Sequence, residues 1–246
     1  MEATVTEIAQ DIFRISIFPE GSPVSFGCFL IRDDQPAMIE TGFNSQFGMY
    51  DLVQAAVSKL IDPKSLRYLI VPHVEGDECG SLVQFLELAP DAVPVCSPVG
   101  ALVTIGDFSP KPARVLGNGE KLVLGRKTLT GVVTPWVHFW DSMLVYDETD
   151  RVLFTSDLFL QAGDREPMTS EDRSAEMVEF ARFSGYLPSQ RHLEKALDLI
   201  EPLAVDVLAC HHGSVLSGDP QRYYKAFRSG MVGDIVDAPF YDMRLP

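Results

Sequence analysis

A histidine and two carboxylates stand at alternate positions, His73, Glu75 and Asp77, just after an apolar segment of the chain. That segment, residues 66–71, has the length and composition of a buried strand. Because an extended chain sends alternate side chains to the same side, the three groups can converge on one point. Imidazoles and carboxylates are metal ligands, so the pattern predicts a metal site at the C-terminal end of a strand. Taken alone, the same residues are also typical of an acidic loop.

The other histidines favour a metal site over an acidic loop. The chain has five histidines, and His138, His211 and His212 also come just after segments with the character of strands. Asp157 follows another such segment, although an aspartate there can also cap a turn, and His138 can also be a packed neighbour of the tryptophans beside it. The fifth histidine, His192, lies in a pattern of helical spacing, where a solvated surface position is expected.

Length and charge limit the class of protein. A chain of 246 residues with 46% hydrophobic content can bury a large core, and we expect one domain over residues 1–246. Its net charge of −15 argues against nucleic acid and anionic membranes as partners, because both bind clustered lysine and arginine. No apolar run reaches membrane-spanning length, and residues 1–11 do not resemble a signal peptide. The four cysteines form no C-x-x-C pair, which argues against a zinc ribbon, and we expect a cytoplasmic protein.

Strands and helices are expected in both halves of the chain. The first half has predicted antiparallel strands at 12–18, 26–31 and 37–39, helices at 51–60 and 80–88, and the strand at 66–71. In the second half, residues 115–124 bracket a turn at 117–119, strands are predicted at 127–134, 143–146, 152–155 and 204–209, and a helix at 191–200. Residues 161–190 are less regular. No low-complexity linker separates the halves, which predicts a layered fold built from two similar parts.

The motifs together resemble those of a known superfamily. They are the His-x-Glu-x-Asp segment, His138 within the stretch WVHFWDSM, Asp157 at the end of LFTSD, and His212 before a glycine. This set is similar to that of the metallo-β-lactamase superfamily. Within it, the chain resembles the diiron domain of flavodiiron proteins and their relatives without a flavodoxin domain, the oxygen-binding diiron proteins. The resemblance extends over about residues 5–218 and implies an α+β fold, a four-layer αββα sandwich of two mixed sheets flanked by helices.

The resemblance also implies a ligand set. It makes His73, Glu75 and His138 ligands of one iron ion and Asp77 and His212 ligands of the other, with Asp157 bridging the two. The chemistry of the donors agrees, because a carboxylate at position 75 in place of an imidazole gives a harder site, which fits iron or manganese better than zinc. Two divalent ions also exceed the three negative charges of the carboxylates, which leaves room for a bridging hydroxide.

Three positions depart from the family pattern. Glu78 stands where relatives usually carry histidine, and as a candidate catalytic residue it is a further ligand, a base, or a helix N-terminal residue favoured by the dipole. Cys79 follows it, with no assigned role. Glu40 replaces the aspartate of the usual Asp-Thr-Gly turn. His211, the second catalytic candidate, stands where relatives often carry a small residue and is either a proton donor or an exposed neighbour. Family position favours His212 over His211 as the ligand.

Two classes of activity fit this site. The first is a diiron protein that binds or reduces dioxygen or nitric oxide with electrons from a separate partner protein, or that acts as an oxygen sensor in which residues 161–190 change shape. We expect no flavin on this chain, because it has no glycine-rich phosphate loop. The second is a dinuclear metal hydrolase, with zinc or manganese as alternatives, that acts on an ester, lactam or phosphoester. A homodimer is left open.

The aromatic residues Phe180, Phe183 and Tyr186 bear on this choice. We expect some of them to line an apolar pocket at the metals that fits a diatomic gas, although they can also be ordinary residues of a helix core.

Overall fold

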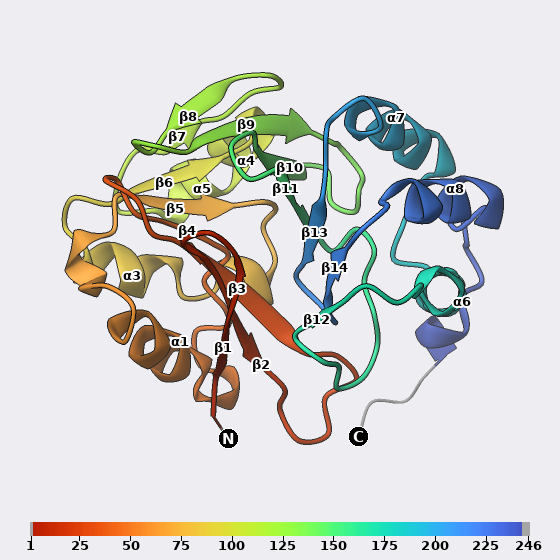
Figure 1. Ribbon diagram of the computed structural model, residues 1–246, viewed down its shortest axis with the longest axis horizontal. Helices are drawn as coiled ribbons and strands as arrows, with labels where there is room; N and C mark the ends of the chain where they lie inside the picture. Colours follow the sequence, from red (N-terminus) through yellow and green to blue (C-terminus); the bar gives the residue numbers. More distant parts are fainter. Residues whose placement is uncertain (1, 243–246) are drawn as a thin grey trace.

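Two seven-stranded sheets face each other, and helices cover the outer face of each in the computed structural model, which describes residues 2–242 (Figure 1). The first sheet has the order β1 (Thr4–Ala9), β2 (Ile12–Ile17), β3 (Phe26–Ile31), β4 (Ala37–Ile39), β5 (Tyr68–Val71), β6 (Val93–Cys96) and β7 (Arg114–Val115). The second has the order β12 (Met168–Thr169), β14 (Val215–Ser217), β13 (Val207–Cys210), β11 (Val152–Ser156), β10 (Met143–Asp147), β9 (Thr128–Val133) and β8 (Lys121–Val123). This is the αββα sandwich that the resemblance implied.

The two sheets repeat one pattern of strand directions. In the first, β1 to β4 are antiparallel and β5 is parallel to β4. In the second, β8 to β11 are antiparallel and β13 is parallel to β11. The prediction of two similar halves is thus confirmed. Parallel neighbours end at the same edge of a sheet, so β4 with β5, and β11 with β13, each bring two chain segments to one edge.

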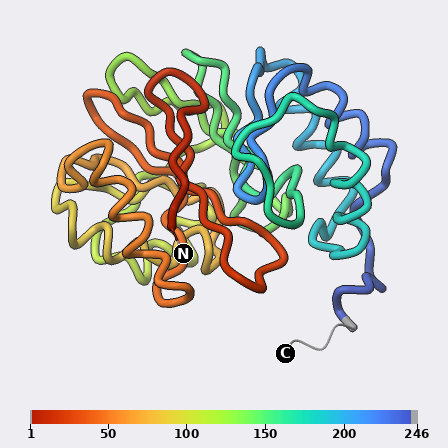
Figure 2. The backbone as a smooth tube through the Cα atoms, turned by 60° about the horizontal axis from the view of Figure 1, so that its bottom comes forward, coloured from red at the N-terminus to blue at the C-terminus, as the bar shows by residue number. Residues whose placement is uncertain are grey.

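The helices divide between the two outer faces (Figures 1 and 2). Those packed on the first sheet are α1 (Met49–Ser58), α3 (Leu82–Leu88), α4 (Pro98–Val103) and α5 (Ile105–Phe108). Those on the second sheet are α6 (Ser174–Ser184), α7 (Gln190–Ile200) and α8 (Gln221–Gly230). The short helices are α2 (Gly76–Cys79), η1 (Gln46–Gly48), η2 (Pro63–Ser65) and η3 (Pro239–Asp242). Within residues 2–242, no helix is both long and apolar enough to cross a lipid bilayer.

Three apolar layers hold the four structural layers together. Strand β5 contributes alternate side chains to two of these layers. Ile70 packs between the sheets, while Leu69 and Val71 pack toward the helices. The rings of Phe29 and Phe154 meet edge to face between the sheets, with centroids 5.3 Å apart. Buried aromatic pairs of this geometry stabilise a core beyond the area they bury.

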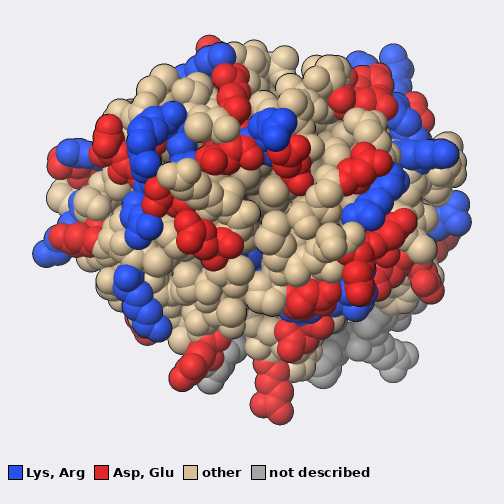
Figure 3. Space-filling model, viewed as in Figure 1, with Lys and Arg blue, Asp and Glu red and all other residues tan. Residues whose placement is uncertain are grey.

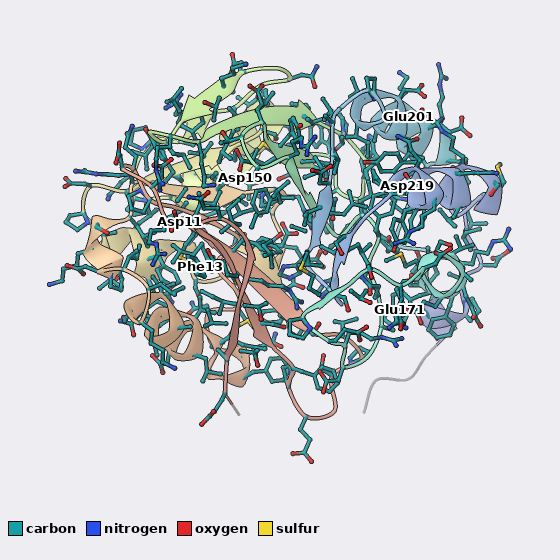
Figure 4. The ribbon with its side chains drawn as sticks, viewed as in Figure 1. Asp11, Phe13, Asp150, Glu171, Glu201 and Asp219 are labelled. Atoms are coloured by element: carbon teal, nitrogen blue, oxygen red, sulfur yellow. The ribbon has the colours of Figure 1, made fainter. Side chains whose placement is uncertain are left out.

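Charged side chains join the sheets at the end opposite the predicted ligands. Arg126 Nη2 lies 3.1 Å from Asp11 Oδ2, and the backbone N–H of Lys127 donates to Asp33 Oδ2 at 2.7 Å, while the Lys127 side chain pairs with Asp150 within the second sheet. Figure 4 shows Asp11 and Asp150 among the side chains of this region. On the face drawn in Figure 3, lysine and arginine side chains are interspersed with acidic ones and form no continuous basic patch.

Some elements were not predicted from the sequence. Residues 161–190 contain β12 and the eleven-residue helix α6, whose apolar stripe is weak because only Met177, Ala181 and Ser184 are buried. The edge strand β1 lies within residues read only as a polar terminus, and only Ile8 of its six residues is buried. Strands β6 and β14 and helices α4, α5 and α8 were also missed.

Candidate metal centre

Strand ends deliver the predicted ligands to one place. His73 follows β5, His138 follows β9, Asp157 directly follows β11, and His212 follows β13. The parallel pairing of β11 with β13 places Ser156 opposite Cys210, so the segments that carry Asp157 and His212 leave the second sheet together. The first sheet supplies His73 to the same region, where its ring lies 3.6 Å from Asp157. The structure therefore brings together groups from both sheets.

Four of the predicted ligands form one donor set. The ligand atoms of His73, Glu75, His138 and Asp157 all lie within 4.8 Å of one another. His138 Nε2 is 2.7 Å from Asp157 Oδ2 and 3.3 Å from Glu75 Oε2, and His73 Nε2 is 3.1 Å from Glu75 Oε2. Two imidazoles and two carboxylates facing a common point make a mixed nitrogen and oxygen site for a divalent ion.

A second donor set adjoins the first and shares Asp157 with it. Asp77, His211 and His212 have ligand atoms within 4.8 Å of one another. Asp157 Oδ1 lies 3.3 Å from His212 Nε2, on the side away from His138. Within the described residues this buried oxygen makes no hydrogen bond. A buried carboxylate oxygen without a partner carries a desolvation cost that a bound cation removes, so the residues fit a pair of metal ions.

Opposite charges set the ionisation of this cluster. Burial acts to raise the pKa of Glu75, but hydrogen bonds from His138 and His73 outweigh it and hold that pKa at about 2. Burial likewise opposes the charge on His138, while Asp157 and Glu75 raise its pKa to about 9. The pKa of Asp157 is held well below its usual range, against its burial, by His212 and His138. The carboxylates are thus ionised at neutral pH, as metal ligands must be.

Glu78 lies behind His73 and is fully buried. Its Oε2 is 3.1 Å from His73 Nδ1 and accepts a hydrogen bond from the His73 backbone N–H at 3.2 Å, and its Oε1 accepts one from Ser156. Burial, with Glu40 and Asp157 nearby, raises its pKa well above the usual range. Glu78 lies in the first turn of α2, as one of the alternatives from the sequence expected, and its buried carboxylate contacts the ring of His73. Cys79 donates from Sγ to the backbone oxygen of Glu75 at 3.1 Å, which anchors the loop.

His211 is also fully buried, which rules out the exposed neighbour considered from the sequence. Its Nδ1 lies 2.7 Å from the backbone oxygen of Gly27 and 2.8 Å from Glu40 Oε2. Burial raises the pKa of Glu40, and the pKa of His211 is raised well above its usual range against its burial, mainly by Glu40 and Asp77. Glu40 has a left-handed backbone, with φ of 64°, which is strained for a residue with a side chain. Glu40, which replaces the aspartate usual in the family's turn, thus provides a buried partner for His211.

Further contacts fix the ligand loops. Asp141 Oδ2 accepts from the backbone N–H of Val74 at 3.0 Å, and the Tyr186 hydroxyl donates to the backbone oxygen of Asp157 at 3.1 Å. The ring of Phe139 stacks on His73 with centroids 5.0 Å apart. Sequence reasoning assigned no role to Asp141 or Phe139, although both lie in the motif around His138, because spacing along one segment does not reveal contacts with another.

His192 is absent from these donor sets. It lies partly exposed on α7, where its Nδ1 is 2.9 Å from the hydroxyl of Ser189, the residue that caps the helix. The expected position on a helix is confirmed.

A cavity of about 600 Å³ opens onto the donor sets. Its wall includes Glu75, Asp77, His138, Asp157 and His212, and the rest of the wall is mostly apolar. Its aromatic lining comprises Trp136, Phe139, Phe180, Tyr186, Phe240 and Tyr241. Two of the three aromatic residues predicted to line the site, Phe180 and Tyr186, therefore do so. Phe183 instead packs near Phe240, with ring centroids 6.3 Å apart.

Comparisons with known proteins agree with this geometry. A family model described as "ODP family beta lactamase" matches residues 24–213. A flavo-diiron protein of Clostridium acetobutylicum is 28% identical over 78% of this chain and 50% of its own length. A nitric oxide reductase of Moorella thermoacetica is 27% identical over 82% of this chain and 52% of its own length. The chain thus spans about half the length of these curated relatives.

A solved structure shows the same fold. The rubredoxin oxygen:oxidoreductase of Desulfovibrio gigas superposes with a TM-score of 0.80 at 20% identity, over 92% of this chain and 61% of that one.

Proposed function

The chain belongs to the family described as ODP family beta lactamase, and on this premise we propose that it holds two iron ions and binds or reduces dioxygen or nitric oxide. Relatives named flavo-diiron protein, nitric oxide reductase and rubredoxin-oxygen oxidoreductase support this choice. As the source of electrons we propose a donor protein that acts on this centre. A bound iron pair would supply the redox chemistry, and the residues described above would hold, orient and enclose it.

The strongest support for a dinuclear centre is the position of Asp157. Its two carboxylate oxygens face different donor sets, Oδ2 toward His138 at 2.7 Å and Oδ1 toward His212 at 3.3 Å. A carboxylate in this position can bridge two ions, so the two sets make one dinuclear centre. Its low pKa keeps both oxygens free to bind metal at neutral pH.

Iron is favoured by the balance of donor atoms. The predicted ligands include three carboxylates, Glu75, Asp77 and Asp157, beside the imidazoles, and oxygen donors shift preference from zinc toward iron or manganese. Two divalent ions exceed these three negative charges by one, which a hydroxide between them would offset. Zinc has no redox chemistry, whereas iron does, and one relative is named a flavo-diiron protein and another a nitric oxide reductase.

The cavity favours a small neutral ligand over the substrate of a hydrolase. Among the described residues that line it there is no lysine or arginine. The metal ions alone would have to stabilise the negative charge of a phosphoester or of the carboxylate of a β-lactam, because no cationic side chain among the described lining residues assists them. Dioxygen and nitric oxide carry no charge, and an apolar wall excludes competing water. Tyr186 stays a neutral donor there, because burial and Asp157 raise the pKa of its hydroxyl well above the usual range.

Metal analysis and rapid mixing test the proposal. Protein expressed with ample iron should contain two irons per chain, and its reduced form should give a new absorption band within seconds of mixing with dioxygen or nitric oxide. The matched control is Asp157→Ala, which should show neither the metals nor the band. Two zincs without iron, together with turnover of an ester or lactam and no spectral change, would assign the protein to the hydrolases instead. Steady consumption of dioxygen with a reduced donor would separate a reductase from a sensor.

A further inference from the structure

His211 is a buried histidine whose second ring nitrogen has no protein partner. The side chain is fully buried, and its Nε2 makes no hydrogen bond to any described residue. The acidic oxygen nearest to Nε2 is Asp77 Oδ2, and the two atoms are 3.6 Å apart, beyond hydrogen-bonding distance. Leaving such a nitrogen unpaired is destabilising, because its desolvation is not compensated. A buried ring nitrogen that faces a carboxylate without bonding to it points to something bound between the two.

Both neighbouring histidines present the same ring nitrogen to the same oxygen. His212 Nε2 lies 3.5 Å from Asp77 Oδ2, and the two imidazole centroids are 4.3 Å apart. Consecutive side chains on a strand face opposite sides, but β13 has ended at Cys210 and the chain turns at Gly213, where φ is +89°. A side chain at Gly213 would also collide with Gln161, whose Cβ would be 2.4 Å away. The turn thus lets two adjacent imidazoles face one point.

The other nitrogen of each ring is held by an acceptor. His211 Nδ1 donates to the backbone oxygen of Gly27 and lies 2.8 Å from Glu40 Oε2, and His212 Nδ1 donates to the backbone oxygen of Ser25 at 2.7 Å. Histidines that bind metal usually donate their remaining N–H to a carboxylate or a carbonyl, which fixes the ring and its tautomer. Both rings therefore have the support that a metal-binding histidine receives, and Glu40 adds a carboxyl group to the support of His211.

Glu78 does not provide a donor to this second set. A ligand atom of Glu78 lies within 4.8 Å of one from His211, but its two carboxylate oxygens are already engaged by His73 and Ser156. Asp77 and His212 would then be left with the shared Asp157 as the only further predicted ligand. His211 supplies another nitrogen, and its ligand atom lies within 4.8 Å of those of Asp77 and His212.

We propose that His211 binds the second metal ion through Nε2, alongside Asp77 and His212, and that Glu40 positions its ring. The inference rests on the proposed dinuclear centre and adds a ligand to it. His212 stays a ligand, so both adjacent histidines bind the second metal ion.

Cobalt titration of the full chain tests the assignment, because cobalt(II) reports binding by its visible spectrum and needs no enzymatic turnover. His211→Asn is the informative variant, since its amide can still donate to Gly27 and Glu40 but offers no nitrogen at the Nε2 position. We expect wild type to bind two cobalt ions. The variant should bind the first normally and the second at least about 100-fold more weakly, since even loss of a supporting partner costs 10–100-fold. His192→Asn on α7 is the matched control and should bind both ions as wild type does.

Glu40→Gln tests the positioning role. It should weaken the second cobalt ion alone, by about 10–100-fold, without changing the first. Equal weakening of both ions would indicate a general structural effect and would remove Glu40 from the proposal. Circular dichroism shows whether each variant is folded, and proton NMR of the cobalt protein provides a second readout. The shifted, exchangeable Nδ1–H signal of His211 should be missing in His211→Asn, even if the weakened second ion is forced in at high concentration.

The outcomes separate this inference from the proposed function. If wild type and His211→Asn both bind two cobalt ions with equal affinity, His211 is not a ligand and the dinuclear centre still stands. If wild type binds only one ion, the dinuclear centre fails and the assignment of His211 fails with it. Two ions in wild type and one tight ion in His211→Asn support both.

Discussion

The protonation of His138 should make the metal-free protein less stable as the solution becomes alkaline. Its pKa in the folded state is about 9, against 6.5 for the unperturbed side chain, because Asp157 and Glu75 outweigh its burial. A pKa raised by folding contributes stability that is fully present below pH 6.5 and is lost as the pH rises through 9. At 1.36 kcal/mol for each unit of pKa, the loss in unfolding free energy is about 3 kcal/mol.

Urea unfolding of chelator-treated protein from pH 6 to 10 measures this loss, and urea avoids the ionic screening of guanidinium. His138→Gln is the matched variant, since it keeps a polar side chain but cannot titrate. The difference between the two proteins should shrink by about 3 kcal/mol over this range. The raised pKa of His211 contributes equally to both proteins and cancels. Glu75, with a pKa of about 2, stays ionised throughout and does not interfere.

Bound metal should abolish the effect, because the ion takes the place of the proton on His138 Nε2. Metal affinity should correspondingly rise about tenfold for each pH unit between 7 and 9 from this residue alone. A difference between wild type and His138→Gln that stays constant from pH 6 to 10 would refute the reasoning. So would a metal-loaded protein that keeps the alkaline loss.

Three further substitutions test other parts of the structure. Asp157→Ala should lose both metal ions, because one carboxylate serves both donor sets, and elemental analysis showing full occupancy would mean that the bridge is misplaced. Glu75→His should shift the metal preference toward zinc in competition dialysis against iron, and an unchanged ratio would contradict the argument from donor hardness. Phe154→Ala removes a fully buried ring packed on Phe29 and should cost about 3–5 kcal/mol in urea unfolding, whereas a cost below about 1 kcal/mol would mean that the space collapses.

The sequence was most informative where neighbours along the chain decide the structure. His73, Glu75 and Asp77 are close because they are alternate residues after one strand, and the apolar composition of that strand marks its end. The hairpin of β10 and β11 was likewise predicted, since its two strands are joined by a short polar turn. The same reasoning missed α8, although Tyr223, Tyr224 and Phe227 form its buried side, because most of its other residues are polar.

The supports of the metal centre could not be predicted in this way. Glu40 is separated from its partner His211 by 171 positions, and Gly27 by 184. Ser25 and Gly27 also contribute backbone oxygens, which every residue has and which no sequence pattern marks. Only the packing of one sheet on the other determines which carbonyl lies beside which ring. Glu78, unlike these distant residues, is close in sequence to the ligand that it contacts. Even so, the sequence does not show that its side chain turns back toward His73.

These long-range supports all cross between the two halves of the chain, and this links the metal centre to the packing of the sheets. Residues of the first half hold both imidazoles of the second: Ser25 holds His212, and Gly27 and Glu40 hold His211. In return, Ser156 of the second half donates to Glu78, which holds His73 of the first. A shift of one sheet against the other would therefore misalign both donor sets at once. Metal ions that bind across this boundary should stabilise the sandwich as a whole, because they bind the folded arrangement and not the separated halves.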